Sequence, residues 1–146
     1  MTYKLRILMF FFVFNFSLNI SYANEMYIQK RIHNFKIAKK AIKNINNHII
    51  KKDYIKINDE IVFLYNWFSV LPSYFPKGTE ASIENNSDAS SEIWEKFHVF
   101  ESLASNSKII SLSMIDDLKQ NYYKQIRVKF DQLNQSCSVC HNKFRN

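Results

Sequence analysis

The residues that most strongly interrupt helices are gathered in one short segment of this 146-residue chain. The chain has one glycine and two prolines, and all three lie between residues 72 and 78. Because glycine and proline are the strongest local breaks in regular structure, the long stretches on either side can form uninterrupted helices. The sequence therefore predicts a few long helices and one extended irregular connection, which continues as a polar run through Ser91.

Four stretches carry apolar residues three and four positions apart, the spacing of one face of an α-helix. They cover residues 28–49, 57–71, 93–112 and 115–133. The last apolar stripe continues onto Cys137, Cys140 and Phe144, so we expect these side chains to face the core. Four helices with one long and two short connections predict an all-α fold, an antiparallel four-helix bundle whose core can hold a cofactor.

The C-terminal segment contains Cys137-Ser138-Val139-Cys140-His141, and Cys-x-x-Cys-His is the attachment motif of a c-type haem. Two thiols three positions apart on a helix lie on one face, one turn from each other. Each sulfur can then form a thioether with one vinyl group of the porphyrin. The adjacent imidazole of His141 is held under the ring as an axial ligand of the iron. The motif predicts one covalently attached haem c.

Other uses of the two cysteines fit the sequence less well. A thioredoxin-like dithiol expects a βαβ context and a helix N-terminus, where the helix dipole stabilises a thiolate. A structural zinc site needs four Cys or His ligands, and the histidines at positions 33, 48 and 98 show no paired spacing with the cysteines. A disulfide between residues three apart on a helix has poor geometry.

The N-terminal segment has the features of a secretory signal peptide. Lys4 and Arg6 precede an apolar run from residue 7 to residue 16, and small residues precede a cleavage site after Ala23. The run is shorter than the roughly 20 apolar residues that span a bilayer, which argues against a membrane anchor. We therefore expect residues 1–23 to be removed on export.

The remainder, residues 24–146, is long enough for one domain. We expect this bundle domain to be soluble in the periplasm, where bacteria attach c-type haem, and to have no integral membrane segment after processing. The whole chain has a formal net charge of +7, and a basic surface can steer docking to an acidic partner protein. No basic patch is interleaved with aromatic residues, so the sequence does not indicate nucleic-acid binding.

Three separated motifs resemble those of the cytochrome c-prime family, the class II c-type cytochromes built on a four-helix bundle. The C-terminal run resembles the family's Cys-x-x-Cys-His-x-x-Phe/Tyr-Arg/Lys ending, with Phe144 and Arg145 at its last two positions. The central segment resembles its Leu-Pro…Phe-Pro-x-Gly and Ile-Trp…Phe patterns, through Leu71-Pro72, Phe75-Pro76, Gly78, Ile93-Trp94 and Phe97. The first helix has Arg31 and Phe35-Lys36 where the family often has Arg-Gln-x-x-Met-Lys.

The resemblance implies roles for several residues around the haem. Arg31 would pair with a haem propionate through a forked, charge-assisted contact, and its alternative is a solvated surface side chain. Arg145, one turn after His141, would lie near the proximal side of the ring, or would only end its helix favourably against the dipole. We expect Tyr74, Trp94 and Phe97 to be core and haem-packing residues, the alternative being redox relays, and Phe144 to line the haem pocket.

Phe35 stands where six-coordinate family members carry a methionine ligand. Members with leucine or phenylalanine there are typically five-coordinate, with a distal face open to small gases, because a phenyl ring cannot donate to iron. Met26, Met114 and His33 lie away from the matching position. A second departure is Asn134, in place of a frequent glycine shortly before the first cysteine.

Four functions follow from these features as hypotheses. They are electron transfer between redox partner proteins, binding of nitric oxide or carbon monoxide as a buffer, sensor or detoxifier, a structural or adaptor role, and thiol–disulfide catalysis. Covalent haem would exclude the last, so we expect a haem- and iron-binding cytochrome and not an enzyme. By analogy with the family, a homodimer through the first two helices is also expected.

Overall fold

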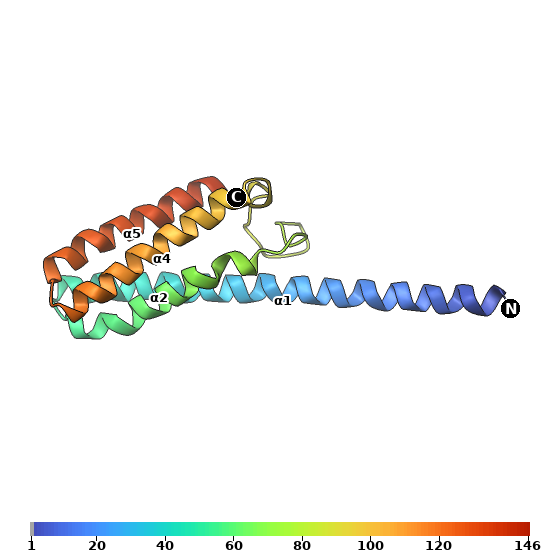
Figure 1. The fold of residues 1–146 in the computed structure, drawn as a ribbon, viewed down its shortest axis with the longest axis horizontal. Helices are drawn as coiled ribbons and strands as arrows, with labels where there is room; N and C mark the ends of the chain where they lie inside the picture. Colours follow the sequence, from blue (N-terminus) through green and yellow to red (C-terminus); the bar gives the residue numbers. More distant parts are fainter. Residues whose placement is uncertain (1) are drawn as a thin grey trace.

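Four long helices run side by side along one axis in the computed structural model, which describes the backbone of residues 2–146 and the side chains of residues 24–146 (Figure 1). The long helices are α1 (Thr2–Ile50), α2 (Asn58–Val70), α4 (Phe97–Lys119) and α5 (Tyr123–Phe144). Shorter turns of helix are η1 (Tyr54–Ile57), η2 (Leu71–Tyr74) and α3 (Glu92–Glu95). α1 packs on α2, α2 on α4, and α4 on α5. The predicted all-α four-helix bundle is confirmed.

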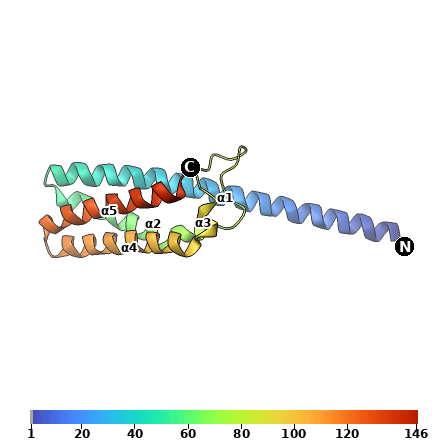
Figure 2. The same cartoon turned by 90° about the horizontal axis from the view of Figure 1, so that it is seen from above.

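The first helix continues well past the bundle toward the N-terminus (Figure 2). The predicted signal segment belongs to this helix, and its cleavage after Ala23 stays a prediction. Of the helices that the structure describes, none is both long and apolar enough to cross a membrane.

The core follows the apolar stripes read from the sequence. Every long helix contributes side chains with almost no exposure, because residues three and four apart return to the same helix face. The most deeply buried apolar side chains, which include Ile57 of η1 and Ile93 of α3, are Ile45, Ile57, Ile61, Leu64, Ile93, Met114, Ile126, Phe130 and Leu133. The core therefore runs the length of the bundle.

The predicted border between the third and fourth helices is wrong. α4 extends through Lys119, so Ile115 and Leu118 belong to it, and α5 begins only at Tyr123. The break is at Asn121, whose φ of 58° is a left-handed conformation that asparagine tolerates better than most residues. The predicted third stretch is also divided, into α3 and α4, at Lys96.

Residues 75–91 form the long connection at one end of the bundle, and the loop is fastened to the end of α5. Ala89 and Arg145 form an antiparallel bridge, and the amide of Ser90 donates to the carbonyl of Phe144 at 3.0 Å. Gly78 has a φ of 88°, which side-chain-bearing residues rarely adopt. Its carbonyl accepts from Asn24 Nδ2 at 3.2 Å, so α1 also holds the loop.

Candidate haem site

The attachment motif lies on the last two turns of α5. Cys137 and Cys140 are free and half-buried, and both pack against the hydrophobic core, as the apolar stripe predicted. Burial raises the pKa of the Cys137 thiol and raises that of Cys140 to about 11. Both side chains are therefore neutral thiols at neutral pH, which is unlike the activated thiolate of a dithiol enzyme.

His141 is next to the second thiol and remains exposed. Partial desolvation lowers its pKa, and the positive charge of Arg145 lowers it further. A lower pKa favours the neutral imidazole, which is the form that binds metals. The side chain can therefore supply an iron ligand without first losing a proton near neutral pH.

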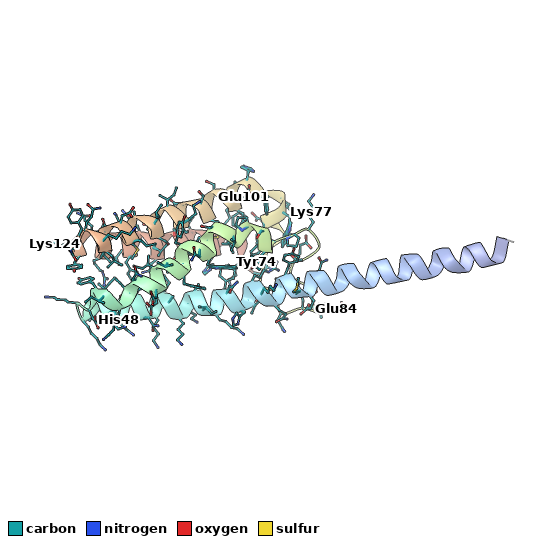
Figure 3. The ribbon with its side chains drawn as sticks, turned by 60° about the horizontal axis from the view of Figure 1, so that its bottom comes forward. His48, Tyr74, Lys77, Glu84, Glu101 and Lys124 are labelled. Atoms are coloured by element: carbon teal, nitrogen blue, oxygen red, sulfur yellow. The ribbon has the colours of Figure 1, made fainter. Side chains whose placement is uncertain are left out.

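An aromatic wall from α1, α2 and η2 stands opposite His141. Phe35 of α1 meets the imidazole edge to face, with ring centroids 6.4 Å apart. Trp67 of α2 lies 5.3 Å from Phe35, and Tyr74 of η2 lies 5.4 Å from Trp67. We call Phe35, Trp67, Tyr74 and His141 the haem-side cluster. Figure 3 shows Tyr74 toward the loop end of the bundle, away from His48 and Lys124 at the other end.

Trp67 was not singled out from the sequence. The stripe of the second helix was followed through Leu64, Phe68 and Leu71, and Trp67 lies next to that series. A usable signal was present, because Leu64, Trp67 and Leu71 are also three and four positions apart. The side chain is almost fully buried.

Arg31 is buried, so its interpretation as a solvated surface side chain is wrong. It is 2% exposed. Its two terminal nitrogens donate to Thr79 Oγ1 at 2.8 Å, to Ser87 Oγ at 2.6 Å, to the Tyr74 carbonyl at 3.3 Å and to the Thr79 carbonyl. Burial lowers its pKa to about 10, with Glu80 acting in the opposite direction, so the side chain stays charged at neutral pH. Its pairing with a propionate remains a prediction.

A second aromatic group surrounds Arg31 at the loop. The guanidinium carbon lies 4.4 Å from the centroid of the Phe75 ring and 6.0 Å from that of Trp94. Phe100 contacts Phe75 at 4.7 Å and Phe144 at 5.6 Å, again between ring centroids. We call Arg31, Phe75, Trp94, Phe100 and Phe144 the loop-side cluster. Phe97 joins it, 6.0 Å from Phe100.

The structure thus brings the predicted site residues together in two groups. Cys137, Cys140, His141 and Phe35 come together, whereas Arg31, Trp94, Phe97 and Phe144 gather beside the loop. Arg145 forms an exposed ion pair with Asp88 through both Nε (3.0 Å) and Nη2 (2.6 Å). The same charge acts on His141, so Arg145 lies near the predicted ligand.

The first group fits a covalent haem. Two free thiols lie one turn apart, a neutral imidazole follows them, and apolar rings face the imidazole from the other side. In the haem-bound protein, Cys137 and Cys140 would hold the porphyrin and His141 would hold the iron. One buried polar atom in the facing wall, Trp67 Nε1, also lacks an acceptor among the described residues.

Comparison with known proteins gives one family throughout. The family model for cytochrome c' matches residues 26–145. The structure is similar to cytochrome c' from Thermochromatium tepidum, with a TM-score of 0.77 at 14% identity, covering 84% of this chain and 95% of that one. It is also similar to a cytochrome c' with ligand-controlled dimer dissociation, with a TM-score of 0.76 at 12% identity over 84% and 95% of the two chains.

A third similar structure is the nitric oxide complex of a mutant of cytochrome c prime from Alcaligenes xylosoxidans. Its TM-score is 0.74 at 17% identity, and the match covers 84% of this chain and 95% of that chain. No curated protein matches the chain in sequence. Because the family model covers most of the sequence, the chain belongs to the cytochrome c' family, haem proteins that carry one covalent haem c.

Proposed function

We propose that this protein is a periplasmic electron-transfer cytochrome, with its haem attached through Cys137 and Cys140 and its iron bound by His141. The single observation that carries this is the intact motif at the end of α5, with both thiols free and His141 directly after the second of them. His141 and Val139 are exposed. A group attached there would have an edge near the surface, within reach of a partner.

The bound haem would supply one-electron redox chemistry and an iron position for a small ligand. The protein's own residues would do the rest. The thioether cysteines would prevent loss of the group, and the core packed behind them would exclude water from one side. Lysine side chains on the exposed faces give the surface a positive charge that favours an acidic redox partner.

Binding of nitric oxide or carbon monoxide is the second candidate, and the contact between Phe35 and His141 favours it. A phenyl ring facing the predicted proximal ligand provides no atom that could bind iron. The iron would then be five-coordinate, and its sixth position would have no ligand from the protein. One similar structure is itself a nitric oxide complex, although at 17% identity that likeness carries only the fold.

Spectra of the purified protein test both candidates. A c-type pyridine haemochrome after acid–acetone extraction is expected, together with a high-spin ferrous spectrum that changes when carbon monoxide is added. Extractable haem would contradict the attachment. A low-spin ferrous protein that does not bind carbon monoxide would contradict the five-coordinate iron and leave electron transfer as the better proposal.

Export is proposed from the sequence of residues 1–23. The intact mass of the protein purified from the periplasmic fraction is expected to begin at Asn24. A membrane-bound product that retains Lys4 and Arg6 would show that the segment is an anchor.

A further inference from the structure

Trp67 carries a buried hydrogen-bond donor that nothing satisfies. Its side chain is 3% exposed, and its Nε1–H has no acceptor among residues 24–146. Buried polar groups in native proteins nearly always have a partner, so each exception calls for a specific reason. A tryptophan also offers only this one polar atom and can act only as a donor.

Two other buried polar atoms lack a hydrogen bond, but each has a charged neighbour. His48 Nδ1 lies 3.6 Å from Asp53 Oδ2. Asp117 Oδ2 lies 2.7 Å from Lys129 Nζ. Within the described side chains, Trp67 Nε1 is therefore the one buried polar atom that lacks both kinds of partner.

The second tryptophan shows how this fold satisfies an indole when the protein itself has to do so. Trp94 Nε1 donates to the carbonyls of Phe75 and Pro76, each at 3.0 Å. The chain contains only these two tryptophans. The loop supplies both acceptors of Trp94, whereas the N–H of Trp67 has no acceptor among the described residues.

The free donor belongs to the wall that faces His141. The Trp67 ring meets the Phe35 ring at 5.3 Å and almost at right angles, and Phe35 in turn faces the imidazole. Leu64 and Phe68 of α2 and Leu71 of η2 are also buried, and the Tyr74 ring lies 5.4 Å from that of Trp67. The described neighbours of the Trp67 ring are thus mainly aromatic, and none of them accepts a hydrogen bond from its N–H.

We propose that Trp67 Nε1–H donates a hydrogen bond to the oxygen of a diatomic ligand bound on the Phe35 side of the iron. This inference rests on the proposed haem site. The bound group would bring two kinds of oxygen acceptor, a propionate carboxylate and the ligand itself. An ionised carboxylate is costly to bury among apolar side chains, whereas a neutral diatomic molecule is not. Trp67 is therefore a specificity-determining residue, which favours ligands with a polar outer oxygen.

The test is the C–O stretching frequency of the ferrous carbon monoxide complex, compared between the wild type and Trp67→Phe. A donor on the oxygen draws electron density into the C–O antibonding orbital and lowers the frequency. The substitution keeps an aromatic ring and removes the N–H, so the stretch is expected to rise. Carbon monoxide affinity should fall about 2- to 13-fold, the equivalent of one net hydrogen bond.

Phe68→Leu is the matched control, because it removes apolar volume from the same turn of α2 and no donor. Its C–O stretch should equal that of the wild type. If Trp67→Phe does not fold, the wild-type complex in heavy water decides the question, because a donated N–D shifts the stretch relative to N–H. Insensitivity to heavy water would overturn the proposal.

Two outcomes separate this inference from the proposed function. Covalent haem and normal carbon monoxide binding, with a stretch that Trp67→Phe leaves unchanged, would overturn the inference alone. A change in midpoint potential without a change in stretch would assign the donor to a propionate, and would overturn it in the same way. Absence of covalent haem would remove the proposed function and this inference together.

Discussion

The two aromatic clusters at the loop end of the bundle differ in how their polar groups are satisfied. In the loop-side cluster the Trp94 indole has two carbonyl acceptors, and the terminal nitrogens of Arg31 have four acceptors. In the haem-side cluster the Trp67 indole has none, and the His141 imidazole is exposed. In the loop-side cluster these polar groups are hydrogen-bonded by the protein itself. In the haem-side cluster the indole N–H and the imidazole are available to a bound group.

This difference indicates that the two neighbouring clusters have different roles, one in stability and the other in binding. Buried polar groups that are fully hydrogen-bonded stabilise a unique arrangement, whereas unsatisfied ones destabilise it. The loop-side cluster therefore fixes the connection of residues 75–91, whereas the haem-side cluster contains a buried donor that costs stability, as we expect of a binding site. Substitutions in the two clusters should act on different properties.

The largest expected effect is the loss of covalent haem in the haem-side region. Cys137→Ser with Cys140→Ser removes both sulfur nucleophiles, so no thioether can form. Haem content after acid–acetone extraction should fall to zero. Ser138→Ala is the control, because this exposed hydroxyl donates only to the Asn134 carbonyl and occupies a variable motif position. Covalent haem in the double variant would contradict the assignment.

The next effect is a change of iron ligation at Phe35. Phe35→Met introduces a thioether sulfur opposite His141, and sulfur is a known axial ligand of haem iron. The ferrous protein should become largely six-coordinate and low-spin and should lose carbon monoxide binding, as read from its visible spectrum. Phe35→Leu, which supplies no donor, should remain five-coordinate. A high-spin methionine variant would show that residue 35 does not face the iron.

A third substitution acts on the loop-side cluster. Arg31→Met leaves the acceptors of Thr79 and Ser87 buried without their donor, and charged hydrogen bonds of this kind are worth about 1.5–3 kcal/mol. Urea unfolding should show a loss of about 3 kcal/mol, while covalent haem is still present. Arg127→Met is the control, because its pair with Asp131 is exposed and should contribute under about 1 kcal/mol. Equal losses in the two variants would contradict the buried role of Arg31.

The smallest effect is expected at the turn of the loop. Gly78→Ala forces a side chain into a left-handed conformation, which costs roughly 1–2 kcal/mol, and the new Cβ would lie 3.1 Å from Asn24 Nδ2. Gly78→Asn should cost less, because asparagine visits this conformation more readily. Thermal unfolding of both variants checks the order. The ligand-binding spectra should not change in either.

The bundle could be predicted from the sequence because the apolar spacing that indicates each helix lies within that helix's own residues. Apolar spacing alone identified α1, α2 and the buried face of α5. The border at Asn121 was missed because the apolar spacing runs on from Leu118 to Tyr122 as if the helix did not stop. Tyr122 is in fact 54% exposed, and only the backbone of Asn121 marks the turn.

The motif at the end of α5 could also be predicted from the sequence, because its chemistry lies within five consecutive residues. The environment of Arg31 could not be predicted, because its partners Thr79 and Ser87 are 48 and 56 residues away in a segment without a periodic pattern. The unsatisfied N–H of Trp67 also could not be predicted from the sequence. An unsatisfied group is defined by what surrounds it, and those neighbours come from three different elements.

The fastening of the loop has a consequence for how the chain reaches its native state. Asp88 bonds Arg145 from 57 residues away, and Ser87 bonds Arg31 from 56 residues away in the other direction. Contacts so distant along the chain carry a large closure entropy and form slowly. The loop can therefore order only after the first and last helices have docked. Its amides should be the last to gain protection against hydrogen exchange during refolding.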